Sequence, residues 1–251
     1  MEKPLSIQLY TVRDHFAQDS LKTLKALKQI GYSAVEFGGS HPWKAPDLKA
    51  QLDEVGMWAL GAHIPVPRLR DDLSGVIGEA KTLGYEYVVC PWLPPEGRGA
   101  EAYRALLPLL AEVGRVCRSE GLIFAYHNHD FELYPVFGPQ NALEFFAERL
   151  EPGLMAFELD VYWAAYAGVE PVKFLEAFAG RAPLLHCKDM TRDDSRTFAE
   201  VGSGRLDFPA VLRSAEALGM RWAVVEQDTC KGDPLDSAAS SFRYLRTQGL
   251  G

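Results

Sequence analysis

The chain has 251 residues, of which 47% are hydrophobic and 24% are charged, a balance typical of a globular protein with a core of ordinary size. Its formal net charge of −8 argues against a nucleic-acid partner, because affinity for the phosphate backbone comes from Lys and Arg. The first residues lack the apolar core of a signal peptide and no apolar run reaches membrane-spanning length, so we expect a cytoplasmic protein without a membrane partner.

Short apolar runs alternate with longer amphipathic stretches along the whole chain. The predicted strands are Ser6–Val12, Ala34–Gly38, Trp58–Ile64, Tyr87–Trp92, Leu122–His127, Leu154–Val161, Pro183–Lys188 and Trp222–Gln227. The predicted helices are Asp19–Ile30, Pro46–Val55, Asp71–Leu83, Ala100–Glu120, Asn141–Leu150, Pro171–Ala179, Phe208–Leu218 and Asp236–Gln248. Several helices end just before a glycine, which can adopt the left-handed conformation that turns the chain back toward a strand.

Eight strand–helix units in unbroken succession indicate parallel strand pairing. A barrel of eight such units typically needs about 250 residues. We therefore predict an α/β fold in which residues 1–251 form a single (β/α)8 TIM barrel. A doubly wound open sheet is the main alternative, but it would need fewer strands, and no GxGxxG motif follows the first strand.

Six of the eight predicted strands finish their apolar run in a residue that can bind a metal or move a proton. These residues are Glu36, His63, His127, Asp160, His186 and Glu226. A buried carboxylate or imidazole is unfavourable unless it is paired, hydrogen-bonded or bound to a metal. One such residue has an ordinary structural explanation, but six require a common cause. Since all strand ends of a barrel meet at the face that carries its active site, we expect a shared site there.

Three of these residues, Asp160, His186 and Glu226, come from three successive units. A mixed set of carboxylate and imidazole ligands suits one divalent ion, Mn²⁺, Mg²⁺, Co²⁺ or Zn²⁺, with positions left open for a substrate. These three residues are therefore the leading candidates for metal ligands.

Several short motifs fall at or near the strand ends in a fixed order. They are QLYTVRD (8–14), VEFGG (35–39), YHNHDFE (126–132), DVYWA (160–164), HCKD (186–189), EVGSG (200–204) and VVEQD (224–228). Together they resemble the sugar isomerase/epimerase family, the xylose-isomerase-like group of TIM barrels. That group also contains endonuclease IV-type enzymes and inosose dehydratases, and the resemblance covers essentially the whole chain.

The resemblance implies a single divalent ion held by Glu, Asp, His and Glu. The last three correspond to Asp160, His186 and Glu226 in this chain. For the first ligand we expect Glu132, since some family members place a glutamate a few residues beyond the fifth strand. Many relatives end that strand in a glutamate where this chain has His127, so His127 is the alternative ligand.

The resemblance also implies proton abstraction next to a carbonyl through an enediolate that a metal stabilises, with Glu132 and Glu226 as the bases. Lys188 lies two residues beyond His186, and alternate residues of a strand share a face. Its ammonium group is expected either to neutralise the enediolate or to form a salt bridge with Asp160 or Glu226.

The expected substrate is a small sugar or polyol, and the motifs suggest the residues that would touch it. Candidate substrate-binding residues are Glu36, His63, His127, His129, Trp163 and Glu200. An apolar wall against a sugar ring is expected from Tyr10, Phe37, Trp92 and Trp163. Packing is the alternative role for the aromatic residues, and a solvated loop position is the alternative for Glu200.

Four functions compete. The first is a metal-dependent sugar isomerase or epimerase, and the second is a lyase that dehydrates a keto-inositol or keto-sugar on the same metal site. An endonuclease IV-like phosphodiesterase would need more metal ligands than six histidines readily supply. A non-catalytic sugar-binding protein would have no need for the Asp160, His186 and Glu226 set. The sequence leaves open whether the chain forms a homo-oligomer.

Overall fold

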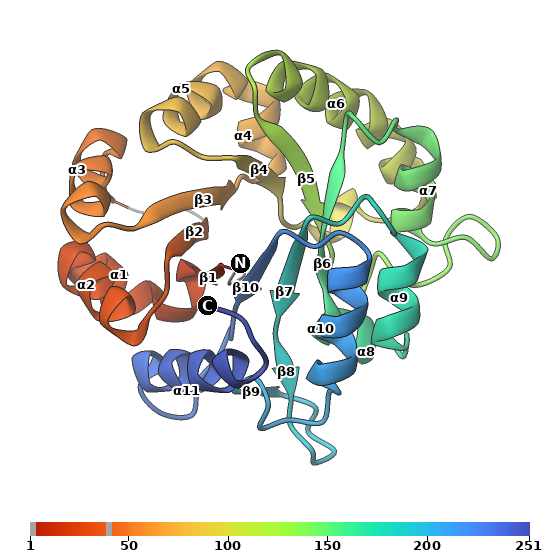
Figure 1. Cartoon of the computed structure of the whole chain (residues 1–251). Helices are drawn as coiled ribbons and strands as arrows, with labels where there is room; N and C mark the ends of the chain where they lie inside the picture. Colours follow the sequence, from red (N-terminus) through yellow and green to blue (C-terminus); the bar gives the residue numbers. More distant parts are fainter. Residues whose placement is uncertain (1–3, 39–41) are drawn as a thin grey trace.

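The computed structural model describes residues 4–38 and 42–251, and in this part of the chain eight parallel strands close into a barrel ringed by helices (Figure 1). Around the barrel the order is β1-β10-β7-β6-β5-β4-β3-β2. These strands are β1 Leu5–Gln8, β2 Ala34–Gly38, β3 Trp58–His63, β4 Tyr87–Cys90, β5 Ile123–His127, β6 Ala156–Asp160, β7 Leu184–Cys187 and β10 Trp222–Val225. The predicted (β/α)8 barrel is confirmed.

The helices lie outside the barrel and cover the strands (Figure 1). They are α1 Arg13–Gln18, α2 Ser20–Ile30, α3 Ala45–Val55, α4 Val66–Asp71, α5 Leu73–Leu83, α6 Ala100–Ser119, α7 Ala142–Arg149, α8 Val161–Tyr166, α9 Pro171–Ala177, α10 Phe208–Ala217 and α11 Pro234–Thr247. Among the described residues, no helix combines the length and apolar character needed to cross a bilayer.

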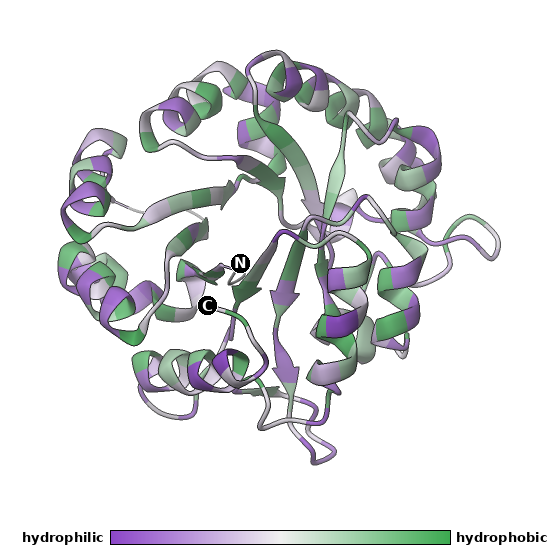
Figure 2. Cartoon of the chain, viewed as in Figure 1, coloured by the Kyte–Doolittle hydropathy of each residue, from purple (hydrophilic) through white to green (hydrophobic). Residues whose placement is uncertain are grey.

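Alternate residues of each strand serve two different cores, and β10 illustrates the pattern. Trp222 and Val224 belong to a small cluster inside the barrel, whereas Ala223 and Val225 join the larger core between strands and helices. The strands accordingly carry mostly apolar colour, and polar residues lie on the outer faces of the helices (Figure 2). By the same alternation, Glu226 follows Val224 on the inward face. Mainly apolar residues therefore fill the amino-terminal part of the barrel interior, with Ser6 among them, and Glu226 lies at the carboxyl end.

The first strand is shorter than predicted. It ends at Gln8, and a 3₁₀ helix occupies Leu9–Val12. The side chain of Gln8 causes the change, because its carbonyl oxygen accepts a hydrogen bond from the backbone N–H of Tyr10 at 3.2 Å. Similarly, the sixth strand stops at Asp160, whose carboxylate accepts from the N–H of Trp163 and so begins α8. Capping side chains, not hydrophobicity, set these strand ends.

A short antiparallel pair, β8 Asp189–Met190 and β9 Phe198–Ala199, extends beyond β7 and was not predicted. The buried carboxylate of Asp189 accepts backbone hydrogen bonds from four residues of this extension. The four donors are Met190, Gly202, Gly204 and Leu206. One carboxylate therefore organises the loop that borders the barrel mouth.

Two helical glycines offer a matched test of packing outside the barrel. A Cβ atom at Gly114 of α6 would overlap the carbonyl oxygen of Leu154, whereas one at Gly78 of α5 would meet nothing within 4 Å. We expect Gly114→Ala to destabilise the fold by about 1–3 kcal/mol through overpacking. Gly78→Ala should stabilise it by about 0.5–1 kcal/mol, because alanine loses less conformational entropy in a helix. Urea unfolding of both variants measures the difference, and equal free energies of unfolding would contradict the packing of α6.

Candidate active site

A cavity of about 290 Å³ opens at the carboxyl ends of the barrel strands. The residues that line it are Tyr10, Gly38, His63, Pro91, Trp92, His127, His129, Lys188, Glu226 and Asp228. They come from nearly every unit of the barrel, as expected for an active site of this fold. The cavity suits a molecule the size of a monosaccharide, with polar groups on its floor and Tyr10 and Trp92 at its sides.

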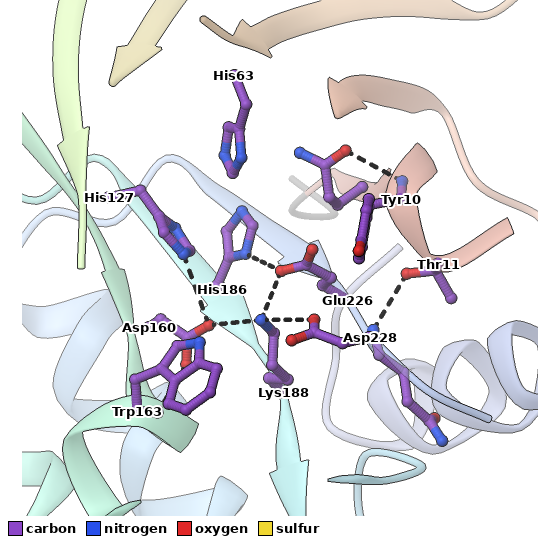
Figure 3. Close-up of polar contacts among 12 residues, drawn as sticks. Tyr10, Thr11, His63, His127, Asp160, Trp163, His186, Lys188, Glu226 and Asp228 are labelled. Atoms are coloured by element: carbon purple, nitrogen blue, oxygen red, sulfur yellow. Dashed lines mark hydrogen bonds and ion pairs between the residues drawn. The ribbon is translucent and has the colours of Figure 1, made fainter. Parts of the chain in front are cut away.

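Lys188 is the centre of the polar floor (Figure 3). Its ammonium nitrogen lies 2.7 Å from Glu226 Oε2, 2.9 Å from Asp228 Oδ1 and 3.2 Å from Asp160 Oδ2. The side chain is buried, so these contacts replace its hydration. Of the two roles expected for Lys188, the salt bridge is present, with Asp160 and with Glu226, and the same ammonium group borders the cavity.

His186 lies between two groups of carboxylates and uses a different ring nitrogen for each. Its Nδ1 is 3.0 Å from Glu226 Oε2, on the side of Lys188. Its Nε2 is 3.0 Å from Glu36 Oε2 and 3.1 Å from Glu158 Oε2, on the opposite side. This imidazole ring therefore connects two groups of side chains. The upper group, which borders the cavity, consists of Asp160, Lys188, Glu226 and Asp228. The lower group, inside the barrel, consists of Glu36, His63, His127 and Glu158.

The lower group gathers around Glu158, a residue of β6 that lies two positions before Asp160. Its Oε2 lies 2.7 Å from His63 Nε2 and 3.0 Å from His127 Nδ1, in addition to the contact with His186. Glu36 Oε2 lies 3.3 Å from His63 Nε2 and accepts a hydrogen bond from the Gln8 amide at 2.8 Å. Three imidazole rings thus surround two fully buried carboxylates.

The pKa values in the upper group follow from the contacts of Lys188. Burial opposes the charged form of Lys188, but Asp160, Glu226 and Asp228 outweigh burial and raise its pKa well above the ordinary value. Burial likewise opposes the ionised form of Glu226, but Lys188 and His186 hold its pKa well below the usual range. Burial, with the neighbouring Glu226, raises the pKa of Asp228 to about 6.

In the lower group, burial and the neighbouring charges shift the pKa values of the two histidines in opposite directions. Burial opposes protonation of His63, but Glu36 and Glu158 outweigh it and raise the pKa of His63 to about 10. The pKa of His127 is instead lowered, first by burial and then by the neighbouring His186. The two rings, with centroids 4.9 Å apart, therefore differ in protonation at neutral pH.

Within the described residues, the donor atoms of the site form two overlapping sets that could hold a metal ion. One set contains His127, Asp160, His186 and Glu226, and in the other His63 and Glu158 join the same two histidines. In each set the donor atoms lie within 4.8 Å of one another. Mixed imidazole and carboxylate donors suit a divalent transition metal.

A test of that fit comes from oxygen atoms that lack hydrogen bonds. Glu36 Oε1 and Glu158 Oε1 are both buried and have no hydrogen-bond partner among the described residues. Buried polar atoms are normally satisfied, so the unsatisfied second oxygens of two carboxylates that contact imidazole rings through Oε2 indicate room for a cation. The residues present therefore fit a bound divalent ion.

Glu132, the expected first ligand, belongs to neither set. Its carboxylate is buried beside β5, where Oε1 accepts from the Tyr126 hydroxyl at 2.7 Å and Oε2 accepts from the His129 backbone N–H at 2.8 Å. It also does not line the cavity. The geometry favours the alternative ligand, His127, and assigns Glu132 to holding the loop after β5.

Burial raises the pKa of Glu132 from 4.5 to about 8, which gives a pH-dependent contribution to stability. The folded protein keeps this proton between pH 4.5 and 8, whereas the unfolded chain loses it. The contribution is therefore fully present below pH 4.5 and is lost as the pH rises to 8, at up to about 1.4 kcal/mol per pH unit. Glu132→Gln should remove this dependence. Denaturant unfolding at pH 5, 6.5 and 8 tests it, and parallel stability profiles of the two proteins would refute it.

The remaining predicted residues divide between the cavity and its surroundings. His63, His127 and His129 line the cavity, and the Trp163 ring packs against His129 with centroids 5.2 Å apart. Glu200 does not line it, since its carboxylate accepts a hydrogen bond from the Ser237 hydroxyl. Phe37 packs in the core against Phe16 instead of forming a cavity wall.

Three important residues were not predicted. Glu158 and Asp228 each lie two positions from a predicted ligand, Asp160 or Glu226, so strand alternation alone could have identified them. Asn128 clamps the backbone of Asp160, accepting from its N–H at 2.9 Å and donating to its carbonyl at 3.2 Å. This clamp joins two neighbouring strands across the barrel mouth, a contact that no local sequence pattern indicates.

Comparison with known proteins agrees with this arrangement. A family model described as xylose isomerase-like TIM barrel matches residues 24–248. An inosose dehydratase of Geobacillus kaustophilus is 26% identical, with 92% of this chain and 87% of that protein aligned. The rhizopine catabolism protein MocC of Rhizobium meliloti is also 26% identical, over 88% of this chain and 79% of its own length.

Solved structures share the fold at lower identity. A sugar phosphate isomerase/epimerase from Parabacteroides distasonis superposes with a TM-score of 0.86 at 23% identity, covering 98% of this chain and 94% of that one. An L-ribulose 3-epimerase superposes with a TM-score of 0.78 at 15% identity, covering 99% and 94%. At such identities these matches establish the barrel alone.

Proposed function

The chain belongs to the xylose isomerase-like TIM-barrel family. From this premise we propose that it is a divalent-metal-dependent enzyme that removes a proton next to the carbonyl of a keto-sugar or keto-polyol. The observation that carries the proposal is the upper group of the site. Glu226 and Lys188 line a cavity of about 290 Å³, and His186 Nδ1 lies 3.0 Å from Glu226 Oε2. These three residues combine a base, a cation and metal ligands.

Asp160, His186 through Nδ1, and Glu226 would hold the ion, with His127 Nε2 as the fourth donor of the set. When bound, a divalent ion polarises a carbonyl group and stabilises negative charge on its oxygen. Asn128 fixes the backbone of Asp160, and Glu36 and Glu158 orient the His186 ring from its far side. Such supporting contacts set the ring orientation of a metal-binding histidine.

Glu226 is the proposed base, because its carboxylate borders the cavity and stays ionised beside Lys188. Its carboxylate oxygen would accept the proton from the substrate carbon next to the carbonyl. Lys188 would donate a hydrogen bond from Nζ to the oxygen on which negative charge develops, which lowers the barrier electrostatically. Tyr10 and Trp92 at the sides of the cavity would exclude water from the reacting carbon.

Dehydration is the preferred outcome. Epimerisation needs a second proton carrier on the opposite face of the substrate, and the carboxylate expected there, Glu132, points away from the cavity into contacts with Tyr126 and His129. Dehydration needs no carrier on that face, because the proton that Glu226 takes from carbon can be returned to the departing hydroxyl group on the same face, which then leaves as water. The 26% identity with an inosose dehydratase supports the same choice.

A sugar isomerase or epimerase is the second candidate. It is favoured by the close superposition with a sugar phosphate isomerase/epimerase and an L-ribulose 3-epimerase. In that case a carrier other than Glu132 would be needed, and Asp228, the other carboxylate that lines the cavity, would have to act from beside Glu226, since both contact Lys188.

Proton exchange in D₂O tests the proposal. The protein is loaded with Mn²⁺, Co²⁺ or Zn²⁺ and incubated with keto-inositols, free ketoses and sugar phosphates, and the substrate is followed by NMR. We expect deuterium next to the carbonyl together with an unsaturated, dehydrated product. Deuterium with a new epimer or isomer and no water loss would favour the second candidate. No exchange with any compound, by protein shown to hold metal, would overturn both.

A further inference from the structure

The strand that precedes the proposed base loses its backbone partner on one side just before the base. Strands β1 and β10 pair in parallel as far as Ile7 and Val225, and β1 then gives way to the 3₁₀ helix of Leu9–Val12. The segment from Glu226 to Asp228 therefore lies beyond the ladder between β1 and β10. Backbone groups that leave a ladder need other hydrogen-bond partners. Those partners decide how firmly this segment is held at the cavity.

Side chains from the segment after β1 supply such partners. The backbone N–H of Gln227 donates a hydrogen bond to the Thr11 hydroxyl at 3.1 Å (Figure 3). Arg13, the first residue of α1, donates from Nη1 to the carbonyl oxygen of Asp228 at 2.9 Å. The same Nη1 donates to the carbonyl oxygen of Tyr10 at 2.8 Å. One guanidinium nitrogen therefore joins the first and the last unit of the barrel beside the cavity.

Arg13 also supports the ring of Tyr10, which lines the cavity although 42% of the residue is exposed. The guanidinium carbon lies 4.3 Å from the centroid of this ring. On the other segment, Asp228 Oδ1 lies 2.9 Å from Lys188 Nζ. Arg13 thus contacts a wall of the cavity and the backbone of a residue that pairs with Lys188.

We propose that Arg13 is a positioning residue, which fixes Tyr10 and Asp228 and, through Asp228, the ammonium group of Lys188. The inference rests on the proposed function, because it gives Arg13 a role in the same proton abstraction. Arg13 itself does not line the cavity, so it acts through these neighbours. An arginine suits this role because a planar guanidinium can lie over a ring while its N–H groups donate at the edge, which an ammonium group cannot do.

Arg13→Ala tests the role in the metal-loaded protein, with the substrate that the D₂O panel identifies. We expect kcat for deuterium uptake to fall by about 10²-fold, the cost of misplacing a reacting group by roughly 1 Å. KM should change no more than a few-fold, because Lys188 acts on charge that develops in the transition state. Arg115→Ala is the control, since it removes an exposed arginine that pairs with Glu112 on α6, and it should keep the wild-type rate.

Added guanidinium distinguishes positioning from a general effect on the fold. Arg13 is exposed, so a free guanidinium ion can occupy the vacated place in Arg13→Ala. Guanidinium chloride, well below the concentration that unfolds the protein, should restore part of the lost rate, whereas sodium chloride at the same ionic strength should not. A wild-type rate in Arg13→Ala, or a lost rate that guanidinium restores no better than sodium chloride, would overturn the positioning role and leave the proposed function intact.

Backbone hydrogen–deuterium exchange, followed by mass spectrometry, needs no substrate. We expect residues 226–230 to exchange faster in Arg13→Ala than in Arg115→Ala, and α6 to exchange equally in Arg13→Ala and the wild type. Unchanged exchange of residues 226–230 would overturn the positioning role on its own. Failure of the wild type to react with any compound would overturn the proposed function instead, and the two failures are therefore told apart.

Discussion

Replacing Glu226 by Gln is expected to lower the rate of proton abstraction by about 10²–10⁴-fold, the usual contribution of a positioned base. Gln keeps the volume of the side chain and one acceptor oxygen but removes the charged carboxylate that lies 2.7 Å from Lys188 Nζ and 3.0 Å from His186 Nδ1. The rate of deuterium uptake into the substrate, at saturating metal, measures the effect directly.

Glu132→Gln is the matched control for this change, because it alters a buried carboxylate of the same type outside the cavity. We expect it to retain exchange within a few-fold of the wild type. Loss of exchange in the Glu132 variant with retention in the Glu226 variant would instead restore Glu132 as the base, as the family resemblance first implied. Metal content and thermal unfolding of both variants show whether a lost rate reflects lost metal or a lost fold.

The barrel was predictable because its pattern is local and repeated. Each strand is a short apolar run, and the helix after it ends at a glycine such as Gly84, which has a φ of 80° in the structure. What the pattern could not indicate were the capping contacts that shorten strands, such as that of Gln8 with Tyr10. The β8–β9 extension depends on the four backbone hydrogen bonds that Asp189 accepts from distant loop residues, which are tertiary contacts.

The site was predictable to the extent that it follows strand ends. His127, Asp160, His186 and Glu226 were all identified as candidates, and the structure places their donor atoms together. Glu132 was harder to place, because a loop residue carries no alternation that fixes its direction. Only the hydrogen bonds from Tyr126 and His129 show that its carboxylate turns away from the cavity.

Glu158 is the residue of the site that strand alternation in the sequence could most readily have identified. It shares the inward face of β6 with Asp160, and a strictly applied alternation would have placed both carboxylates inside the barrel. Its three contacts with histidines from β3, β5 and β7 depend on barrel closure. The contacts of the lower group therefore follow from topology, whereas the proposed metal ligands of the upper group follow from sequence motifs.

Lys188→Met should destabilise the metal-free protein by about 3–5 kcal/mol, the range observed when one partner of a buried ion pair is removed. Met approximates the length and volume of the lysine stem, so packing changes little. The loss comes from Glu226, Asp228 and Asp160, whose carboxylates would face one another without the ammonium group that lies 2.7–3.2 Å away. Urea unfolding after chelator treatment measures this loss.

Lys49→Met provides the control, because Lys49 pairs with Asp53 on an exposed face of α3. Such surface pairs contribute about 0–1 kcal/mol, so this variant should unfold close to the wild type. Added Mn²⁺ should recover more stability in the Lys188 variant than in the wild type, since a divalent ion can replace the missing charge among the same carboxylates. Equal stability of the two lysine variants would mean that the carboxylates of the upper group are protonated or solvated in the metal-free protein. The ionised state of Glu226, on which its proposed role as the base depends, would then have to be abandoned.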